Sequence, residues 1–374
     1  MNIILVGCGL FNIVVANLLS NAFNITIIDK RNHIGGNCYD FIDYDTGIII
    51  HKYGPHIFHI GDKFVYNYIS KFTEFNNYKH QVRAEYNNIK YEFPINLDTI
   101  NSFFSVNLRP YEVDNFLREK VKKHYISKPS NMEEKIINLI GVELYEAFFK
   151  EYTIKQWGKF PSELPEDTIK RIPIKNNYDT NYYKKTFNGI PKDGYSTMFS
   201  RMLAHKNISV ELEVDFFEYR DYFLNKGIVI FTGSIDEFFD YKFGKLEYRS
   251  LRFQEELHHV NDWQGNSVIN YPELKFEYTR ICEHKHFYPE KWDRFSSNKT
   301  IIYKEIPYSS INSEPYYPIT DEQNLYIYNK YLQESLQIDN LYFGGRLGEY
   351  KYYDMEDTIK SAHKLANKLL ELYS

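Results

Sequence analysis

The sequence predicts a mixed α/β fold in which a βαβ unit opens the chain and later segments return to complete it. Three observations indicate this. A buried strand, a glycine turn and a helix follow one another within the first 19 residues. Helical periodicity dominates residues 97–155, whereas residues 241–317 alternate as in antiparallel sheet. A short strand, a Gly-Gly-Arg turn and an amphipathic helix close the chain.

The bulk composition restricts the class of protein. With 374 residues the chain is too long for one simple core, so we expect two or three lobes that share a cleft. A net charge of −5 argues against a nucleic-acid partner, and any anionic ligand then needs a local cluster of Arg or Lys. Cys8, Cys38 and Cys282 match neither a disulfide framework nor a zinc site, which favours a reducing, cytoplasmic compartment.

The first element is a strand at residues 3–6, followed by a helix at residues 10–19 and a second strand at residues 25–28. A targeting peptide is excluded because no basic residues precede the apolar run and because Asn12 and Asn17 interrupt it. No stretch approaches the roughly 18 apolar residues that a membrane span needs, so we expect no membrane partner.

The turn between the first strand and helix is similar to a dinucleotide-binding fingerprint. Gly7 and Gly9 stand where the first two glycines form the turn and let the backbone approach a pyrophosphate. Asp29 ends the second strand, where an acidic residue hydrogen-bonds the adenosine ribose. Asn12 replaces the third glycine, which serves helix packing, so we expect a slightly displaced helix and retained binding.

The C-terminal segment predicts a discontinuous nucleotide domain. Residues 341–343 form a strand before a Gly-Gly-Arg turn, and a helix capped by Asp354 follows. This layout is common among FAD proteins, whereas NAD-only dehydrogenases more often finish the Rossmann sheet in one stretch. The expected domains are an FAD-binding Rossmann-like domain from residues 1–80, 190–240 and 325–374, an inserted helical domain from residues 97–165, and an inserted antiparallel β-sheet substrate domain from residues 81–96, 166–189 and 241–324.

Long motifs occur in every one of these segments. They are KRNHIGGN at 30–37, HKYGPHIFH at 51–59, EYTIKQWG at 151–158, KRIP at 170–173, EYRSL at 247–251, YTRICEHKHF at 278–287, EPYYP at 314–318 and FGGRLGEYKYYDM at 343–355. In this order the motifs resemble the bacterial-type UDP-galactopyranose mutases, and the resemblance covers essentially the whole chain.

The resemblance implies an isomerase that interconverts UDP-galactopyranose and UDP-galactofuranose for galactofuranose biosynthesis. The implied ring contraction passes through a covalent adduct of N5 of reduced FAD with the anomeric carbon of galactose. A homodimer and a cellular reductant such as NAD(P)H for the flavin are implied as well.

The resemblance also assigns residues to the site. Arg171, in the segment 165–175 that matches a mobile loop, and Arg280 match two arginines on the substrate diphosphate, where paired donors that stay charged are needed. The resemblance also assigns His59 as the third catalytic residue, close to the flavin. The implied cofactor-binding residues are Gly7, Gly9, Leu10, Phe11, Asn12, Asp29, Lys30, Gly36, Asn37, His56, Ile57, Val214, Arg346, Tyr353, Asp354 and Met355. The implied substrate-binding residues are His80, Phe148, Phe149, Tyr152, Thr153, Trp157, Arg171, Tyr182, Asn270, Arg280, Tyr317, Arg346 and Tyr352.

Some alternatives remain open. Phe148 and Phe149 fit core packing of a helix as well as a uridine contact. His51, His56 and His59 look like metal ligands, but their spacing matches no zinc pattern and no cysteine or carboxylate lies near, so we expect no metal site.

Four residues depart from the family pattern. Asn12 replaces a glycine, Glu151 and Asp193 replace two more, and His80 stands where a substrate-contacting asparagine is usual. The departures leave the identity of the sugar open. Two other functions compete with the mutase: an FAD-dependent oxidoreductase of the amine-oxidase type, and a non-catalytic homologue that binds a UDP-sugar or flavin.

Overall fold

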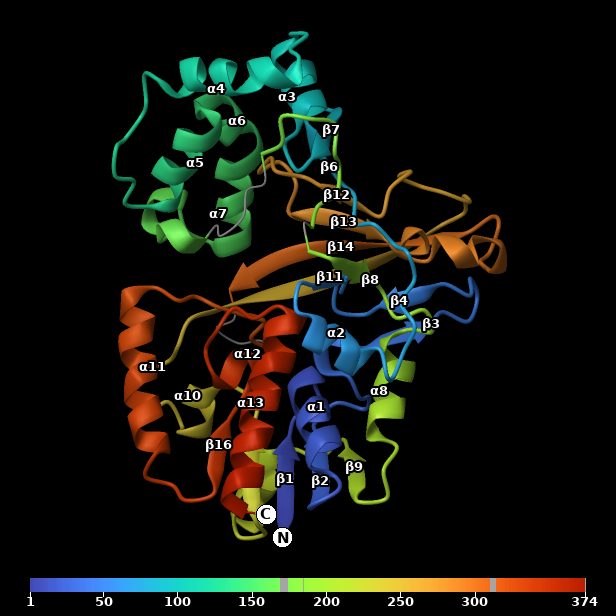
Figure 1. The fold of residues 1–374 in the computed structure, drawn as a ribbon, viewed down its shortest axis with the longest axis vertical. Helices are drawn as coiled ribbons and strands as arrows, with labels where there is room; N and C mark the ends of the chain where they lie inside the picture. Colours follow the sequence, from blue (N-terminus) through green and yellow to red (C-terminus); the bar gives the residue numbers. More distant parts are fainter. Residues whose placement is uncertain (169–173, 184, 310–313, 374) are drawn as a thin grey trace.

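The structure, a computed structural model, describes residues 1–168, 174–183, 185–309 and 314–373. Figure 1 shows a helix-covered sheet at one end of the long axis, a second sheet across the middle and a group of helices at the other end. Within the described ranges, no helix combines the length and the apolar character needed to cross a membrane.

A five-stranded parallel sheet lies at the end of the molecule where both chain termini are found (Figure 1). Its central strands, at residues 2–6 and 228–231, are buried on both faces and are therefore apolar nearly throughout. Ile3 and Leu5 pack into the core under one layer of helices, whereas Ile4 and Val6 pack into the core on the other side. The strand order is β16 (Leu341–Phe343), β10 (Ile228–Phe231), β1 (Asn2–Val6), β2 (Asn24–Asp29) and β9 (Ile208–Leu212).

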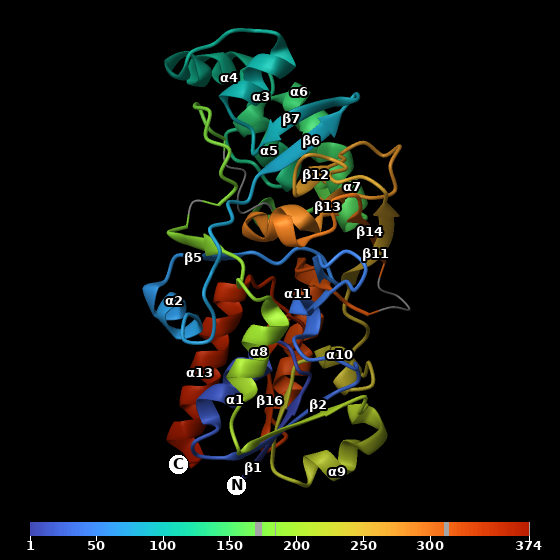
Figure 2. The ribbon, with the colours of Figure 1, turned by 90° about the vertical axis from the view of Figure 1, so that its right-hand side faces the viewer.

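Helices from distant parts of the chain cover this sheet. The predicted N-terminal helix is confirmed as α1 (Leu10–Leu19), and it packs against the C-terminal helix α13 (Met355–Tyr373) and against α8 (Tyr195–Leu203), as Figure 2 also shows. Buried Ala362 and Ala366 of α13 belong to the same core as α1. The remaining helices of this part are α2 (Lys63–Ile69), α9 (Arg220–Leu224), α10 (Ile235–Phe238), α11 (Glu322–Ser335) and α12 (Gly345–Gly348).

The second sheet is antiparallel apart from one parallel pairing, β12 with β6. Its seven strands, in order, are β15 (Tyr317–Pro318), β11 (Tyr248–His258), β14 (Thr300–Ser309), β13 (Arg280–Glu283), β12 (Val268–Asn270), β6 (Val82–Tyr86) and β7 (Ile89–Phe93). Two small pairs, β3 (Asp40–Ile42) with β4 (Ile49–His51) and β5 (Phe58–Ile60) with β8 (Phe187–Gly189), lie outside both sheets.

The helical group has its own core. Asn96 caps its first helix, since its side chain accepts a hydrogen bond from the Thr99 amide (3.0 Å). Ile136, Ile140 and Leu144 recur at helical spacing, are fully buried and form the centre of this core. The helices are α3 (Leu97–Phe104), α4 (Val113–Val121), α5 (Met132–Ile140), α6 (Val142–Tyr145) and α7 (Glu151–Trp157), with one π turn (Glu146–Lys150) before α7.

Candidate active site

Three glycines bring backbone segments together at the carboxyl end of β1. Gly7 has φ +96°, and a Cβ there would lie 2.3 Å from Oγ1 of Thr232. Gly9 is the N-cap of α1, and in the part of the chain that the structure describes a Cβ there would meet no heavy atom within 4 Å. A Cβ on Gly36 would lie 2.9 Å from the Cα of Gly9. The turn therefore needs Gly7 and Gly36 for its own packing, whereas Gly9 borders open space in which a ligand can approach the backbone.

Asp29 fixes this turn from the end of β2. One carboxylate oxygen accepts the Cys8 amide (2.7 Å), and the other accepts the Arg31 amide (2.8 Å). Since a carboxylate oxygen has two acceptor positions, each can still accept a ribose hydroxyl.

Asn12 is accommodated by hydrogen bonds to the turn itself. Its fully buried Nδ2 donates to the carbonyls of Val6 (3.0 Å) and Gly7 (2.9 Å). Its Oδ1 is buried and has no partner in the described part of the chain. The residue thus ties α1 to the turn, which a third glycine cannot do.

We expect Asn12→Gly to lower the melting temperature, although glycine is the usual residue of the fingerprint. The variant loses the hydrogen bonds to the carbonyls of Val6 and Gly7, each worth about 1 kcal/mol, and a longer one to Thr232 (3.5 Å), and it adds a helical glycine that costs about 1 kcal/mol. Asn12→Ala keeps the helix propensity and should lose only the first contribution. Thermal unfolding of both variants measures the difference, and an unchanged melting temperature in Asn12→Gly would contradict the tie.

The other implied cofactor residues lie around the turn or at the chain segments facing it. Phe11 fills the space beside Gly344, and Val214 donates its amide to the Asp29 carbonyl (3.0 Å). Lys30 forms an exposed ion pair with Glu314 (3.1 Å). Leu10 and Ile57 are buried. Asn37 accepts a hydrogen bond from Arg31, and Tyr353 donates one to Glu349. The sulfur of Met355 lies 4.0 Å from that of Cys38.

Arg346 lies where the two ends of the chain meet the second sheet. Its Nη2 donates to the carbonyl of Tyr353 (2.8 Å). The guanidinium carbon lies 5.0 Å from the ring centre of Tyr317 and 5.5 Å from that of Tyr352. The aromatic faces stabilise the cation where little water reaches it.

His59 and Asp354 join β5 to the start of α13. His59 Nε2 lies 3.2 Å from Oδ2 of Asp354, whose Oδ1 caps the helix by accepting the Asp357 amide (2.8 Å). Burial alone would raise the pKa of Asp354, but the hydrogen bonds from His59 and Asp357, together with the charge of Lys185, hold it well below its usual value. The predicted helix cap is confirmed, and this carboxylate is ionised at neutral pH.

His56 is a neutral ring close to two arginines. Its Nδ1 lies 2.9 Å from the carbonyl oxygen of Gly54 and can donate only as N–H. Burial, together with the charges of Arg346 and Arg280, lowers the pKa of His56 to about 4, although the hydrogen bond to the Gly54 carbonyl opposes this change. The opposite nitrogen, Nε2, therefore stays unprotonated at neutral pH.

Arg280 presents open donors at the centre of the second sheet. Its Nε donates to Oε2 of Glu305 (2.7 Å), the residue paired with it across β13 and β14. Glu305 is 1% exposed, whereas the Arg280 side chain is 28% exposed. Within the described ranges, the two terminal nitrogens of Arg280 have no partner. The buried carboxylate orients a guanidinium whose outer donors remain free for an anion.

Tyrosines surround this guanidinium. Burial raises the pKa of Tyr152 to about 12, and the nearby Arg280 charge opposes that rise. The same two effects act on Tyr182, whose pKa is also raised. Tyr317 and Tyr352 stack with ring centres 5.2 Å apart. Trp157 lies 6.3 Å from Tyr352, and Asn270 faces Arg280 in the register of β12 and β13.

Three implied substrate residues are placed differently. Thr153 is 2% exposed. Phe148 and Phe149 lie in the core of the helical group, with Phe148 5.4 Å from Tyr91 and Phe149 6.0 Å from Phe93, ring centre to ring centre. Core packing, the alternative left open for the two phenylalanines, describes this placement. Arg171 lies outside the described residues.

Two residues of the site have no counterpart in the sequence predictions. Tyr183 lies between two histidines, with its ring centre 4.0 Å from that of His59 and 5.5 Å from that of His80. Glu305 lies in a strand far from any site motif. A single tyrosine carries no signal in a chain with 35 of them, and the pairing of Glu305 with Arg280 depends on strand register.

Two of the family departures, Glu151 and Asp193, form contacts with residues other than Arg280. The carboxylate of Glu151 accepts the amide of Leu274 (2.6 Å), and Asp193 pairs with Arg201 (3.3 Å) at the surface. Neither carboxylate is aimed at Arg280 in this arrangement.

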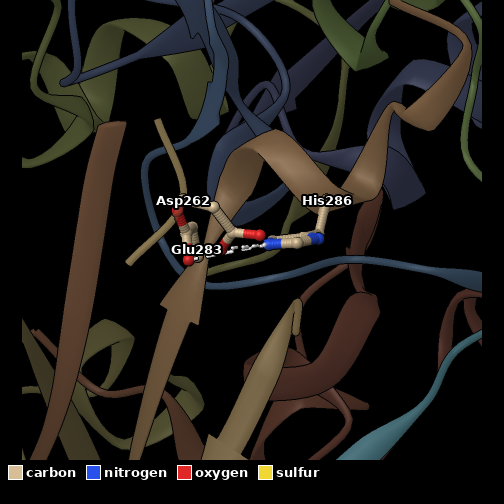
Figure 3. A group of neighbouring side chains, drawn as sticks. All are labelled: Asp262, Glu283 and His286. Atoms are coloured by element: carbon tan, nitrogen blue, oxygen red, sulfur yellow. Dashed lines mark hydrogen bonds and ion pairs between the residues drawn. The ribbon is translucent and has the colours of Figure 1, made fainter. Parts of the chain in front are cut away.

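One group outside this site has the composition of a metal site. Asp262, Glu283 and His286 converge at one end of β13 (Figure 3). Glu283 already accepts the Gln264 amide (2.9 Å), and Asp262 accepts the Gly265 amide (2.8 Å). Although burial opposes the charged ring, hydrogen bonds with both carboxylates raise the pKa of His286. The group therefore forms an ion-paired anchor for residues 262–265.

Comparisons with known proteins agree with this arrangement. A family described as UDP-galactopyranose mutase matches residues 147–352, and one described as an NAD(P)-binding Rossmann-like domain matches residues 5–72. A probable UDP-galactopyranose mutase of Klebsiella pneumoniae is 42% identical, over 99% of this chain and 94% of that protein. A dTDP-fucopyranose mutase of Escherichia coli is 38% identical, over 97% of each.

The fold is similar to a crystal structure of reduced UDP-galactopyranose mutase, with a TM-score of 0.77 at 13% identity, over 100% of this chain and 96% of that one. The predicted α/β class with a Rossmann-like domain is confirmed. At 42% identity over nearly the whole length, the chain belongs to the UDP-galactopyranose mutase family.

Proposed function

We propose that this chain interconverts UDP-galactopyranose and UDP-galactofuranose, with FAD as its cofactor. The observation that carries the proposal is Arg280, whose terminal nitrogens have no partner among the described residues and which lies among Tyr152, Tyr182 and Tyr317. Such a cation with aromatic neighbours suits a nucleoside diphosphate, which needs charge-assisted donors and flat contact surfaces.

The residues at the glycine turn fit a dinucleotide cofactor. Gly9 borders open space at the start of α1, where the pyrophosphate of FAD would meet backbone N–H groups. Asp29 would accept a ribose hydroxyl, and His56 and Arg346 would hold the flavin end. When bound and reduced, FAD would supply the nucleophilic nitrogen chemistry that an isomerisation of the sugar without net oxidation needs.

The side chains then have only to bind and orient the substrate and to neutralise the charge of its diphosphate. Arg280 stabilises the diphosphate as its negative charge grows on leaving, because the Glu305 bond already fixes the guanidinium and little reorganisation is needed. Arg171 is the second arginine of this proposal, as the family resemblance implies. The rings of Tyr182 and Tyr183 pack beside His80, on one side of the proposed sugar site.

Two histidines of the site have fixed surroundings that set their orientation or protonation. His59 is oriented by Asp354 on one side and by the ring of Tyr183 on the other. Neutral His56 offers an unprotonated Nε2 close to Arg346 and Arg280. The reaction needs no side-chain nucleophile.

A second candidate substrate is dTDP-fucopyranose, because the Escherichia coli mutase for that sugar is 38% identical over 97% of both chains. The predicted domain bounds, a homodimeric assembly, a cytoplasmic location and a reductant such as NAD(P)H belong to the same proposal.

One experiment separates the mutase from its alternatives. The yellow protein is incubated with UDP-galactofuranose or dTDP-fucofuranose, with and without dithionite, and the products are separated by chromatography. Conversion to the pyranose only under reducing conditions is the expected result. Oxidation of the sugar without dithionite would support an oxidoreductase of the amine-oxidase type, and UDP binding without turnover would support a non-catalytic homologue.

A further inference from the structure

A chain of three polar contacts begins at His80 and leads away from the site. His80 Nδ1 lies 3.0 Å from the hydroxyl of Tyr78, which lies 2.6 Å from Oγ of Ser267. Ser267 Oγ in turn lies 3.3 Å from the backbone carbonyl oxygen of Gln81. All three side chains are at most 6% exposed, so water does not compete for these contacts.

Only one assignment of donors and acceptors satisfies all three contacts. The carbonyl of Gln81 can only accept, so Ser267 donates to it. Having used its one proton, Ser267 must accept from the Tyr78 hydroxyl. Tyr78, having donated, must accept from His80, which therefore carries its proton on Nδ1.

The other nitrogen of His80, Nε2, is left as a hydrogen-bond acceptor on a ring that lies near Arg280 and His59. Burial lowers the pKa of His80 to about 3, with the charges of Arg280 and His59 acting in the same direction, so the ring is neutral at pH 7. With the proton on Nδ1, Nε2 is an acceptor. It has no partner in the described part of the chain and is not sealed off from solvent. The ring packs beside Tyr182 and Tyr183, which border Arg280.

We infer that His80 Nε2 is a fixed hydrogen-bond acceptor. It selects the substrate by accepting a hydrogen bond from one hydroxyl group of the galactose. This inference rests on the proposed function, since it assigns a contact to the same substrate. An asparagine at this position offers both a donor and an acceptor and rotates between them, whereas His80 is locked by Tyr78 and Ser267. The lock makes the site discriminate a group that can donate from one that can only accept.

Binding of sugar analogues to the oxidised holoenzyme tests this role without turnover. The ligands are UDP, UDP-galactose and four UDP-galactose analogues with fluorine in place of the hydroxyl at C2, C3, C4 or C6. Fluorine cannot donate a hydrogen bond, so we expect one analogue to bind the wild-type chain about tenfold more weakly than UDP-galactose. In His80→Leu, that analogue and UDP-galactose should bind equally well, while UDP affinity stays at the wild-type value.

A second variant tests whether the discrimination depends on the proton that Tyr78 holds on Nδ1 of His80 or on the packing of the Tyr78 ring. Tyr78→Phe keeps the ring but removes the hydroxyl that holds the proton on Nδ1, so its discrimination should fall partway toward that of His80→Leu. Tyr68→Phe is the matched control, because Tyr68 is a buried tyrosine that donates to Asn17 (3.0 Å) away from the site. It should keep the wild-type pattern.

The outcomes are distinct. Equal discrimination by His80→Leu and the wild type, at every position of the sugar, would overturn the role of His80 while UDP binding left the proposed function intact. Failure of the wild-type chain to bind UDP at all would overturn the proposed function and this inference with it.

Discussion

Arg280→Ala should lower turnover of the reduced enzyme by a factor of about 10²–10³, the usual effect of removing one preorganised charged donor. The FAD content should stay at the wild-type level, because Arg280 lies in the second sheet and not at the glycine turn. The loss should fall mainly on kcat, since the leaving diphosphate needs the guanidinium more than the bound substrate does. Steady-state conversion and the ratio of flavin to protein measure both effects.

Arg280→Ala also leaves Glu305 buried without its cation, which would destabilise the chain for reasons unrelated to catalysis. The double variant Arg280→Ala, Glu305→Gln removes that charge and should recover the melting temperature but not the turnover. Arg252→Ala is the matched control, because this exposed arginine on β11 forms an ion pair at the surface with Glu277 (3.8 Å). Wild-type turnover in the double variant would show that Arg280 does not hold the diphosphate.

Gly9→Val should fold and yet be purified almost without FAD. The position has φ −88°, which valine adopts, and an added Cβ would lie more than 4 Å from every heavy atom of the described residues beyond its chain neighbours. The side chain would instead occupy the space that the pyrophosphate needs, and we expect the affinity for FAD to fall by at least about tenfold. Absorbance of bound flavin and circular dichroism of the same sample separate loss of cofactor from loss of fold.

Gly7→Val provides the contrast. Its φ of +96° and the 2.3 Å approach of a Cβ to Thr232 make the substitution incompatible with the turn itself. This variant should therefore lose the folded structure as well as the flavin. Full flavin occupancy in Gly9→Val would place the cofactor elsewhere and contradict the assignment of the turn.

Features encoded by short-range spacing could be predicted from the sequence. The strand at residues 3–6, the helix that follows and the cap at Asp354 each depend on neighbouring residues, and all are present. The position of Asp29 at the end of β2 also follows from local spacing. What the spacing could not show is that both carboxylate oxygens of Asp29 hold backbone amides of the turn.

Features that depend on register or packing could not be predicted. The bond between Arg280 and Glu305 exists because two antiparallel strands pair in one particular register. From the sequence, Phe148 and Phe149 could equally stack on a nucleotide base or pack in a core. Only the packing of the helical group places them in its core. The lock on His80 joins Tyr78 to Ser267, 189 positions apart in the chain.

The strand order of the five-stranded sheet has a consequence for biosynthesis. Residues 341–343 and the helix after them complete a unit that the first 29 residues begin. While the ribosome is still adding the intervening segments, the nascent glycine turn lacks its final neighbours. A cofactor held at this turn would therefore reach its final surroundings only after residues 341–373 have been synthesised.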